Sequence, residues 1–385
     1  MENNLLNDKQ QMRNRPLKVA IVCDWLTGIG GAERVVLELH KLYPKAPIYT
    51  SQYDPSKIDW FADADVRTTG LQKLPKSLKK FLPLLRAWTF SRLDLSEYDL
   101  VISSSGAEAK GVKTGPNTIH ISYCHSPTHY YWVRSDEYMA KPGFPIGLNW
   151  LAKLGLKFLI DPLKRWDFQA SKHADFMIAN STHTQNMIKR YYKRDSTVIF
   201  PPVEVERFEI LGKPLLRHGF VVAGRQTPYK RIDLAIEACN QLKVPLMVIG
   251  NGPDHKRLEK MAGRSITFLT SVNDTSLAEH FQSALGFIMP NMDDFGIVAV
   301  EAMAAGTPVI AYEKGGSLDY LIPNKTGLFF DKQNVKNLTA VLENALTKSF
   351  DYDAIADHAK QFSTSVFREN MQAYINECLK SKAAE

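Results

Sequence analysis

Short apolar runs alternate with helical patterns along most of the chain. Residues 17–23 form a nearly continuous apolar run, which is typical of a strand buried on both faces of a parallel sheet. A loop over residues 24–31 and a helix over 32–42 follow it. Further strands are predicted at residues 47–50, 100–103, 118–123, 176–179 and 198–200. This alternation predicts an α/β domain built on a parallel sheet.

The second half of the chain repeats the alternation after Pro201-Pro202 and a connector that extends to residue 218. Strands are predicted at residues 220–223, 245–249, 266–269, 286–289 and 308–311, and helices at residues 232–242, 253–261, 275–284 and 297–305. A chain of 385 residues is long for one hydrophobic core, so two domains are expected. We therefore predict an α/β fold of two tandem Rossmann-like, doubly wound domains.

The expected domains have definite boundaries. Residues 1–16 form a disordered tail, residues 17–202 an N-terminal domain, and residues 203–365 a C-terminal domain, while residues 366–385 form a helix that packs back toward the N-terminal domain. Ligands of doubly wound sheets bind at the carboxyl ends of the strands, so a cleft between the two domains is the expected site.

Positive charge is concentrated in residues 66–93. The chain has a net charge of +7, and this segment carries seven Lys and Arg residues without any Asp or Glu. Its apolar residues recur at helical spacing, which favours contact with an anionic membrane surface. The alternative is a surface helix that packs its apolar side on its own domain, and Pro75 and Pro83 argue against one uninterrupted helix. No RNA- or DNA-binding signature accompanies the charge, so no nucleic-acid partner is expected.

The rest of the composition indicates a cytoplasmic protein. Four cysteines stand far apart without paired spacing, which is typical of a reduced protein. No run of about 18 apolar residues predicts a transmembrane helix, and residues 1–15 lack the apolar core of a signal peptide. Together with the basic segment, these features predict a cytoplasmic protein at the inner face of the cell membrane.

Two stretches of the second half combine cations, a glycine-containing loop and carboxylates. Residues 223–231 (AGRQTPYKR) place cations directly after a predicted strand. Residues 291–309 (NMDDFGIVAVEAMAAGTPV) place a glycine-containing loop before a helix, with carboxylates at Asp293 and Glu301. Cations and the N-terminus of a helix bind a diphosphate, and carboxylates bind sugar hydroxyls. The pattern therefore predicts a nucleotide-sugar site.

Over residues 17–380 the chain resembles glycosyltransferase family 4, a group of retaining, metal-independent enzymes with the GT-B fold. The two stretches just described carry most of the likeness. Three cues in the first half are similar to bacterial mannosyltransferases of surface-polysaccharide and lipid-linked oligosaccharide assembly: residues 24–26 (DWL), 30–34 (GGAER) and 123–127 (YCHSP). The resemblance implies a GT-B enzyme that binds a nucleotide sugar and holds no cofactor or metal.

The resemblance also implies roles for the cations and carboxylates. Arg225 and Lys230 hold the donor diphosphate, where fixed cations stabilise the negative charge that grows as the glycosidic bond breaks. Glu301 hydrogen-bonds the nucleotide ribose. Asp293 stands where the family usually has Glu, so its shorter side chain is expected at the sugar hydroxyls with reduced reach. The ordinary alternatives are surface cations on a turn and, for Glu301, a charge that favours the helix dipole.

One histidine joins the implied site. His125 follows a predicted strand, and the resemblance places it at a hydroxyl of the transferred sugar. A buried histidine with a structural partner is the alternative. A zinc site made of Cys124, His125 and His129 is disfavoured, because Pro127 interrupts the regular helix that such spacing requires.

Backbone groups complete the implied site. They belong to Phe295, Gly296, Ile297 and Val298 at the donor diphosphate, to Gly30 and Gly31 at the donor phosphate, and to Val272 at the nucleotide base. The alternatives are a tight turn at the glycine pair and a helix cap by Asn273 or Asp274.

The implied activity is transfer of a hexose to a glycan or polyprenyl-linked glycan acceptor, with mannose from GDP-mannose as the first choice. UDP-glucose or UDP-N-acetylglucosamine as donor remains an alternative, and so does a non-catalytic nucleotide-sugar-binding protein. Glu108 and Asp136 lie in the first domain, where the acceptor is expected, and nothing in the sequence ranks them.

Overall fold

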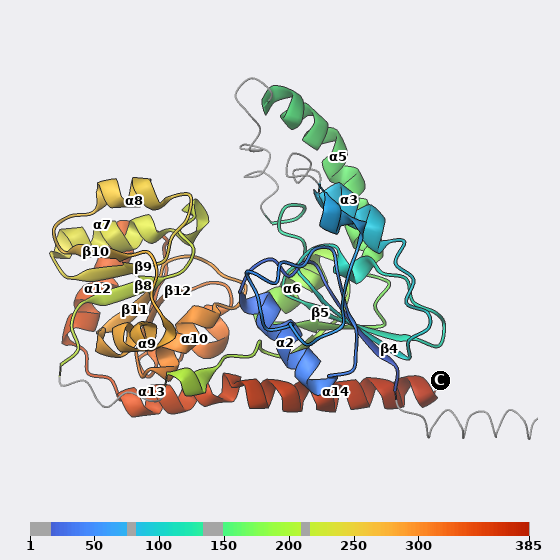
Figure 1. The fold of residues 1–385 in the computed structure, drawn as a ribbon. Coiled ribbons are helices and arrows are strands. Elements are labelled where there is room, and N and C mark those ends of the chain that lie inside the picture. Colours follow the sequence, from blue (N-terminus) through green and yellow to red (C-terminus); the bar gives the residue numbers. More distant parts are fainter. Residues whose placement is uncertain (1–16, 75–81, 134–148, 209–215, 385) are drawn as a thin grey trace, which may run out of the picture. The chain divides into compact units, whose positions relative to one another are not determined.

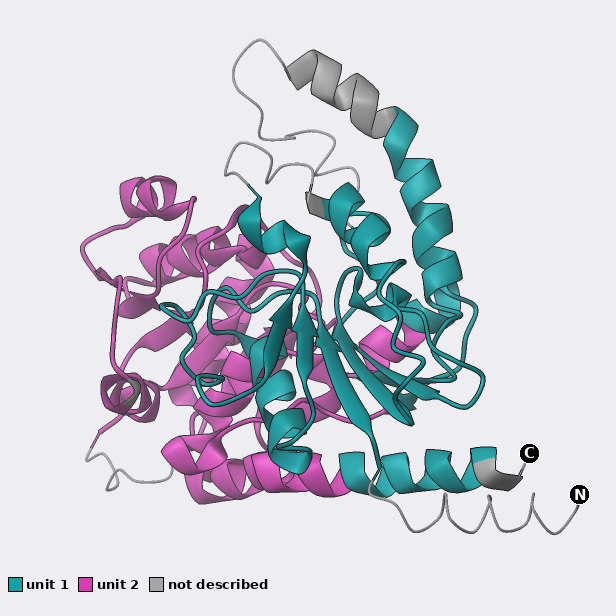
Figure 2. Ribbon diagram, turned by 45° about the vertical axis from the view of Figure 1, so that its right-hand side comes forward, with its two compact units in different colours: residues 1–179, 187–197, 371–385 teal, residues 180–186, 198–370 magenta. Residues whose placement is uncertain are grey.

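The computed structural model describes residues 17–74, 82–133, 149–208 and 216–384 (Figure 1). The chain divides into two compact units (Figure 2). Unit 1 comprises Met1–Ala179, Met187–Thr197 and Met371–Glu385, and unit 2 comprises Asn180–Asn186 and Val198–Asn370. The predicted tail at residues 1–16 lies outside the described residues, and so does Asp136.

Within the described residues, unit 1 holds a seven-stranded sheet in the order β3-β2-β1-β4-β5-β6-β7. Its strands are β1 (Val19–Cys23), β2 (Ile48–Thr50), β3 (Val66–Thr68), β4 (Leu100–Ser105), β5 (Ile119–Cys124), β6 (Phe176–Ala179) and β7 (Thr197–Val198). All neighbours from β3 through β6 pair in parallel. The central strands β1, β4 and β5 are buried along their whole length, as continuous apolar runs predict.

Helices cover the sheet of unit 1. They are α2 (Gly31–Leu42), α3 (Leu82–Phe90), α5 (Asn149–Ala170), the second part of α6 (Thr182–Tyr191) and the second part of α14 (Thr364–Ala384). Helix α2 contacts β1 and β4 and buries Val35, Val36 and Leu39. Phe90 of α3 packs against Ala20 and Val22, which share one face of β1 because side chains alternate along a strand.

Unit 2 holds a six-stranded sheet among its described residues, in the order β10-β9-β8-β11-β12-β13, and every pairing is parallel. The strands are β8 (Phe220–Ala223), β9 (Leu246–Ile249), β10 (Ile266–Leu269), β11 (Gly286–Met289), β12 (Val309–Tyr312) and β13 (Gly327–Phe330). Two parallel sheets therefore stand where the sequence predicts two doubly wound domains.

Two hydrophobic clusters show how the helices of unit 2 cover both faces of its sheet. Phe220 and Val222 point into a cluster with α7 (Ile232–Leu242), α8 (His255–Met261) and α12 (Val335–Thr347). Val221, which lies between them, points into a second cluster with α9 (Asp274–Ser283), α10 (Ile297–Ala304) and α13 (Tyr352–Ala359). The short helix α11 (Ser317–Tyr320) adds Tyr320 to the second cluster. This is the two-faced burial of an α/β layer structure.

The basic segment 66–93 is not one helix. It contains β3, a 3-10 turn at Gly70–Lys73 and α3, while residues 75–81 lie outside the described residues. Leu84 and Ala87 of α3 pack against Tyr131 and Leu163 of their own unit. Part of the helical spacing of apolar residues in this segment therefore reflects the packing of α3 on its own unit.

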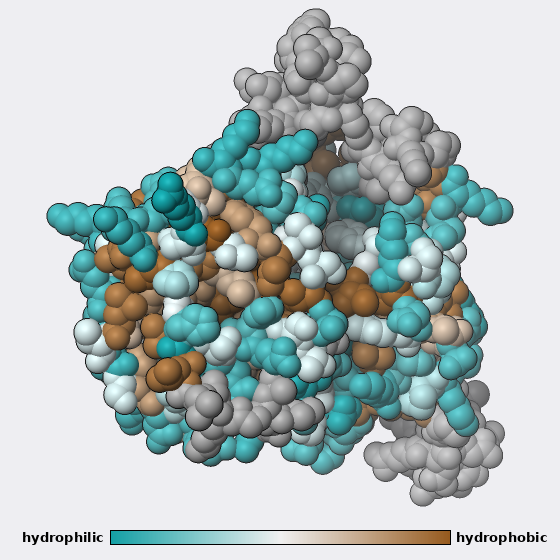
Figure 3. Space-filling view, turned by 60° about the vertical axis from the view of Figure 1, so that its left-hand side comes forward, coloured by the Kyte–Doolittle hydropathy of each residue, from teal (hydrophilic) through white to brown (hydrophobic). Residues whose placement is uncertain are grey.

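Single apolar side chains reach the surface at many places. Figure 3 shows one face of the molecule, on which brown hydrophobic residues lie between teal hydrophilic ones. Trp88 is 58% exposed and Leu216 84% exposed. Across the part of the chain that the structure describes, no helix combines the length and apolarity needed to span a membrane.

Candidate functional site

The order of the strands reverses direction once in each sheet. In unit 2 the chain runs outward from β8 to β9 and β10 and then returns to the other side of β8 with β11. In unit 1 it runs outward from β1 to β2 and β3 and returns with β4. Doubly wound sheets bind ligands outside the carboxyl ends of their strands at such a reversal. The loops after β8 and β11, and those after β1 and β4, are therefore the candidate sites of the two units.

A buried glutamine anchors the loop after β8. The Gln226 side chain donates from Nε2 to the Gly250 carbonyl at 2.7 Å, and its Oε1 lies 2.6 Å from His255 Nδ1. Gly250 has a φ of 115°, and a Cβ there would collide with the Gly224 carbonyl oxygen, so only glycine fits. Arg225, which stands between these anchored residues, is exposed. The structure thus fixes the backbone and presents the Arg225 side chain to solvent.

Two glycines fix the loop after β11. A Cβ on Gly315 would collide with the backbone of Asp293, and a Cβ on Gly316 would collide with the backbone of Asp294. The Gly316 N–H also donates to the Asp293 carbonyl at 2.9 Å. Because the two segments touch backbone to backbone, the position of the Asp293 side chain is set by the fold.

Phe295 and Gly296 lead from this loop into α10. The Phe295 ring is buried against Phe200, Tyr320 and Phe362, at centroid distances of 5.7, 5.5 and 5.7 Å. Gly296 has a φ of 99°, a left-handed conformation that favours glycine, and it stands immediately before the helix. The side chain of Phe295 therefore belongs to the core, and a ligand would reach the backbone here and no other part of Phe295.

The loops after β8 and β11 meet through an ion pair. Lys230 Nζ donates to Asp293 Oδ2 at 2.5 Å, and the two side chains are 23% and 24% exposed. Burial lowers the pKa of the Lys230 ammonium, but attraction to Asp293 outweighs it, so this pKa is raised above its ordinary value. Lys230 therefore stays charged at the carboxyl edge of the sheet. A fixed, partly solvent-facing ammonium is suited to binding an anion.

The helix α10 carries the predicted carboxylate. Glu301 is 7% exposed and lies between Val300 and Ala302, which are completely buried. The first turn of the same helix contains Ile297 and Val298, both of which are half-buried. The first N–H groups of a helix lack intrahelical acceptors and carry its positive dipole end. The first N–H groups of α10 and the Glu301 carboxylate thus stand one turn apart.

The loop after β10 ends in a helix cap. The Asn273 side-chain oxygen accepts the Ser276 N–H at 2.8 Å at the start of α9. This confirms the cap that the sequence predicts, with Asn273 as its residue. Val272 is half-buried against the neighbouring core. A role of its backbone in binding the nucleotide base stays a prediction.

The loop after β1 in unit 1 enters α2 through the glycine pair. Gly30 caps the helix in an extended conformation, and a Cβ there would lie 2.8 Å from Glu33 Oε2. Gly31, Glu33 and His125 line one cavity of about 400 Å³, together with Asp24, Ser104 and His129. The predicted Gly31 and His125, which are far apart in the sequence, therefore share a pocket at the strand reversal of unit 1.

His125 is held at the end of β5. Its Nε2 lies 2.8 Å from Ser104 Oγ, and its backbone N–H donates to the Ser105 carbonyl at 3.0 Å. The Tyr123 ring lies 5.3 Å from the imidazole ring. These contacts fix the imidazole at the edge of the cavity. Among the described residues no group of three His, Cys, Asp or Glu side chains gathers as a metal site, and metal-independent chemistry stays a prediction.

Asp24 joins the two loops at this reversal. One carboxylate oxygen accepts the N–H groups of Gly106 and Ala107 at 2.8 and 3.0 Å, and the other accepts that of Ala109 at 2.7 Å. The aspartate therefore holds the loop after β4 against the end of β1. The sequence identifies Asp24 only as part of a motif, because its partners lie more than 80 positions away.

Glu33 is the group of this cavity that the sequence did not select. Burial raises the pKa of its carboxyl to about 7, opposed by a backbone hydrogen bond and increased further by repulsion from Asp24. A carboxyl with such a pKa changes its charge near neutral pH, which is a common property of functional sites. Its position in the first turn of α2 was visible in the sequence, but its burial was not.

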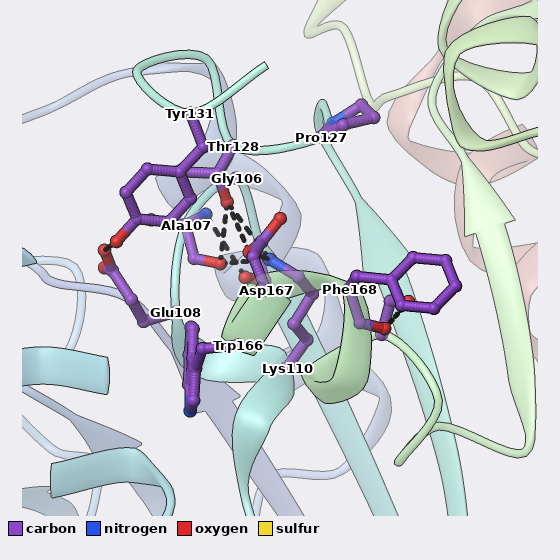
Figure 4. Close-up of polar contacts among 12 residues, drawn as sticks. Gly106, Ala107, Glu108, Lys110, Pro127, Thr128, Tyr131, Trp166, Asp167 and Phe168 are labelled. Carbon is purple, nitrogen blue, oxygen red and sulfur yellow. Dashed lines mark hydrogen bonds and ion pairs between the residues drawn. The ribbon is translucent and has the colours of Figure 1, made fainter. Parts of the chain in front are cut away.

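A buried ion pair supports the cavity from the side of α5 (Figure 4). Lys110 Nζ lies 2.6 Å from Asp167 Oδ1, and the two side chains are 1% and 0% exposed. The same carboxylate accepts hydrogen bonds from Thr128 at 2.8 Å, from Trp132 at 2.7 Å and from Tyr192 at 2.7 Å. Asp167 thereby ties the loops after β4 and β5 to two helices.

Glu108 does not have the exposed position that an acceptor-binding residue needs. Its carboxylate is fully buried and accepts Arg86 Nε at 2.7 Å, the Tyr130 hydroxyl at 2.5 Å and the Tyr131 hydroxyl at 3.1 Å. The Tyr131 contact is drawn in Figure 4. Glu108 is therefore a positioning residue for Arg86, and the sequence could not show this because the partners come from two other segments, at residue 86 and at residues 130–131.

Comparisons with known proteins agree with this arrangement. The family model described as Glycosyltransferase Family 4 matches residues 29–207, and the one described as Glycosyl transferases group 1 matches residues 204–362. The chain belongs to the family 4 glycosyltransferases. The two matches meet at residues 204–207, and together they include every predicted site residue of this glycosyltransferase.

Two relatives illustrate the similarity of this chain to named enzymes. The alpha-1,3/1,6-mannosyltransferase ALG2 of Mus musculus is 24% identical, over 90% of this chain and 93% of its own. The D-inositol 3-phosphate glycosyltransferase of Mycobacterium leprae is 29% identical, over 51% of this chain and 53% of its own.

Solved structures show that this glycosyltransferase has the GT-B fold. Sucrose-phosphate synthase from Thermosynechococcus elongatus superposes with a TM-score of 0.70 at 18% identity, over 95% of this chain and 100% of that one. Anabaena Alr3699/HepE in complex with UDP-glucose gives a TM-score of 0.68 at 16% identity, over 94% of this chain and 100% of that one. The predicted fold class is confirmed.

Proposed function

We propose that this glycosyltransferase transfers mannose from GDP-mannose to a glycan or a lipid-linked glycan, with retention of the anomeric configuration. Relatives named as mannosyltransferases extend over about nine-tenths of the chain, which supports mannose as the transferred sugar. The observation that carries the proposal is the Lys230–Asp293 ion pair beside the N-terminus of α10. It places a cation, a carboxylate and free helical N–H groups at one sheet edge.

The donor diphosphate binds, in this proposal, to Lys230, Arg225 and the N–H groups of Ile297 and Val298. Lys230 then exchanges the Asp293 carboxylate for phosphate oxygens, which its ammonium binds as a point charge. The carboxylate that is released accepts hydroxyl groups of the sugar. As the glycosidic bond breaks, the diphosphate gains negative charge, and the fixed cations and helix N-terminus stabilise that charge.

The positions of Glu301 and Val272 support the remaining proposed contacts with the donor. Glu301 accepts hydroxyl groups of the ribose, because it lies one turn further along α10 from the diphosphate-binding N–H groups. Val272 offers backbone groups to the base from the loop after β10. No nucleophilic side chain is required, since retention follows when the leaving phosphate takes the proton of the attacking acceptor hydroxyl on the same face of the sugar.

In this proposal the acceptor binds in the cavity of unit 1 that Gly31 and His125 line. Gly30 and Gly31 expose backbone where a phosphate approaches, and His125 contacts a hydroxyl of the transferred sugar. Ser104 keeps the imidazole in one orientation through the 2.8 Å contact. Positioning of this kind accelerates transfer by holding the reacting groups in line.

We also propose peripheral contact of residues 66–93 with an anionic membrane. Arg67 is engaged by Asp65 at 2.7 Å and Arg86 by Glu108, so these two cations serve the fold. Lys73 is exposed at the end of the 3-10 turn, and Lys76, Lys79 and Lys80 follow it in residues outside the described part. A cluster of four lysines supplies enough charge to attract acidic lipids at about 1 kcal/mol per residue.

Release of GDP from GDP-mannose tests the proposed activity. The purified protein is incubated with GDP-mannose, EDTA and a polyprenyl-linked glycan fraction, and free GDP is followed with time. We expect GDP release that rises with the acceptor fraction and persists in EDTA. The matched controls are UDP-glucose and UDP-N-acetylglucosamine. Release from a UDP-sugar alone would replace the donor, and loss of all release in EDTA would contradict the metal-independent mechanism.

A further inference from the structure

A second cavity lies in unit 1 and shares Trp25 with the pocket that holds His125. It has a volume of about 550 Å³, within the usual range for ligand sites, and its lining includes Gln52, Asp54, Lys57 and Arg86. Trp25 lines both cavities. A chain-like ligand could therefore pass from one cavity to the other along the face of this indole ring.

The Trp25 ring is held in place. The Arg86 guanidinium lies 4.6 Å from the ring centroid, in cation–π contact. Arg86 is itself fixed by Glu108 at 2.7 Å and by the Tyr130 hydroxyl at 3.2 Å. An aromatic ring whose orientation is fixed is a preorganised platform for the apolar face of a sugar ring.

The opposite wall of the cavity is also preorganised. The Leu26 N–H donates to the Gln52 carbonyl at 2.8 Å, and the Asp54 N–H donates to the Leu26 carbonyl at 2.9 Å. Gln72 exchanges two hydrogen bonds with the backbone of Tyr53, at 2.8 and 2.9 Å. These bonds hold the backbone of residues 52–54 against the loop after β1, so their side chains line a formed cavity.

The charges of the lining balance. Lys57 lies 3.1 Å from Asp54, and the buried Arg86 is neutralised by Glu108. A diphosphate would gain little from this surface, because each cation already has a carboxylate partner. An aromatic face surrounded by amide and carboxylate groups matches a ligand with an apolar ring face and neutral hydroxyl groups.

We propose that this second cavity binds the sugar ring of the acceptor that lies next to the ring receiving the transferred sugar. The enzyme then extends an existing neutral oligosaccharide of at least two rings, with Trp25 under the linkage between them. This inference rests on the proposed glycosyl transfer, because it names the acceptor that the cavity beside His125 presents for reaction.

Binding of neutral mannosides tests the inference without catalysis. The full-length protein is titrated by calorimetry with methyl α-mannoside and with mannobiose. We expect mannobiose to bind roughly tenfold more tightly than the monosaccharide, since a second ring adds stacking and hydrogen bonds. Failure of mannobiose and related neutral disaccharides to bind at millimolar concentration would overturn the inference.

Two variants with a matched control locate the binding. Asp54→Ala should remove most of the disaccharide advantage, while Asp59→Ala, an exposed aspartate five positions away that does not line the cavity, should keep it. Trp25→Ala should also remove the advantage, and Trp25→Phe should retain part of it. Thermal unfolding of each variant checks that the fold persists. An unchanged advantage in both Asp54→Ala and Trp25→Ala would contradict the proposed location.

A separate titration with GDP-mannose distinguishes failure of the acceptor subsite from failure of the proposed transfer reaction. If GDP-mannose binds and mannobiose does not, the acceptor subsite is wrong while the proposed transferase stands. If mannobiose binds at Trp25 and no nucleotide sugar binds, the transfer reaction is wrong and the cavity is a glycan-binding site of another kind.

Discussion

Lys230 and Asp293 show how single residues set the chemistry of unit 2. Asp293 is one methylene shorter than the glutamate that the family usually carries, yet it reaches Lys230 at 2.5 Å. The contact compensates for the lysine's burial and keeps its pKa high. The Asp293 side chain is therefore long enough to pair with Lys230. Substitution of Asp293 tests its proposed contact with a sugar hydroxyl.

Substitution of Asp293 separates these two tasks. Asp293→Ala should lower kcat/KM for GDP release by about 100-fold or more, comparable with the loss of one transition-state hydrogen-bond partner. Asp293→Glu should retain activity to within about tenfold, because the carboxylate is kept. Steady-state kinetics of GDP release make the comparison. Equal activity of wild-type protein and Asp293→Ala would show that this carboxylate takes no part in the reaction.

Glu33 makes the stability of unit 1 depend on pH. Its pKa is raised from 4.5 to about 7 in the folded protein, so between these values the folded state holds a proton that the unfolded state has lost. Stability therefore falls as pH rises through this window, and above it the charged carboxyl costs roughly 3 kcal/mol.

The variant Glu33→Gln removes this cost. We expect its melting temperature to exceed that of the wild type at pH 8 and to match it near pH 5, with Glu97→Gln as an exposed control that shows no such difference. Thermal melts at the two pH values measure the effect. A Glu33→Gln protein that is less stable than wild type at pH 8 would contradict the predicted protonation.

Some site residues could be predicted from the sequence, and others could not. Arg225, Lys230, Asp293 and Glu301 could be selected because each stands in a local motif after a strand or in a helix. Glu33 was visible only as a helix charge, since nothing local reveals its burial. Glu108 was considered for the acceptor and proves to be enclosed by Arg86 and two tyrosines, a role that depends on contacts across long sequence separations.

At the scale of elements, Asp167 joins segments that the chain itself does not connect. Its carboxylate pairs with Lys110 and accepts three further hydrogen bonds from Thr128, Trp132 and Tyr192. The helix α5 is thereby fixed to the loops that carry His125. A fully buried ion pair of this kind is costly to break, because the remaining partner is left as an unpaired charge.

Asp167→Ala should therefore destabilise unit 1 by about 3–5 kcal/mol. Asp161→Ala, an exposed aspartate on the same helix, should change stability by less than about 0.5 kcal/mol. Urea unfolding followed by tryptophan fluorescence compares the two. A similar midpoint for both variants would contradict the supporting role of the buried pair.

Element prediction succeeded for the central strands and for α7, and it missed short strands at the sheet edges as well as the 13-residue helix α12. The pattern of residues 232–242 gave α7 with correct ends. It missed β3, whose residues are mostly exposed at the edge of the sheet, and β13, a four-residue strand at the opposite edge of the other sheet. Short edge strands lack the long apolar run that marks central strands. Residues 66–93 do not form one uninterrupted helix, as Pro75 and Pro83 indicate, and α3 packs its apolar side on its own unit.

At the scale of the whole molecule, helix α14 (Thr364–Ala384) contributes residues to both units. Its residues up to Asn370 belong to unit 2, and Met371 and the residues beyond it belong to unit 1. In unit 1, Lys382 bonds Asp175 at 2.8 Å and the Thr118 carbonyl at 3.3 Å. The part of α14 from Met371 onward therefore belongs to the unit that the first half of the chain forms.

The proposed membrane attachment concerns the whole molecule, and neutralisation of the lysine charges tests it. A variant with Lys73, Lys76, Lys79 and Lys80 changed to Gln should sediment less with vesicles of phosphatidylglycerol and phosphatidylcholine than the wild type does. Wild-type binding should weaken as salt rises, because screening shortens the reach of the lysine charges. The control variant neutralises Lys256, Lys260, Lys332 and Lys336 in unit 2. Equal sedimentation of wild type and the first variant would contradict attachment through residues 66–93.

The central claim is a metal-independent GDP-mannose site built by Lys230, Asp293 and α10. Its most direct test is calorimetric titration of the purified protein with GDP-mannose, UDP-glucose and UDP-N-acetylglucosamine in the presence of EDTA. The account predicts binding of GDP-mannose that is lost in Lys230→Ala and Glu301→Ala and kept in Lys256→Ala, an exposed lysine on α8. Binding of a UDP-sugar in its place would contradict the donor, and absence of all binding without metal would contradict the site itself.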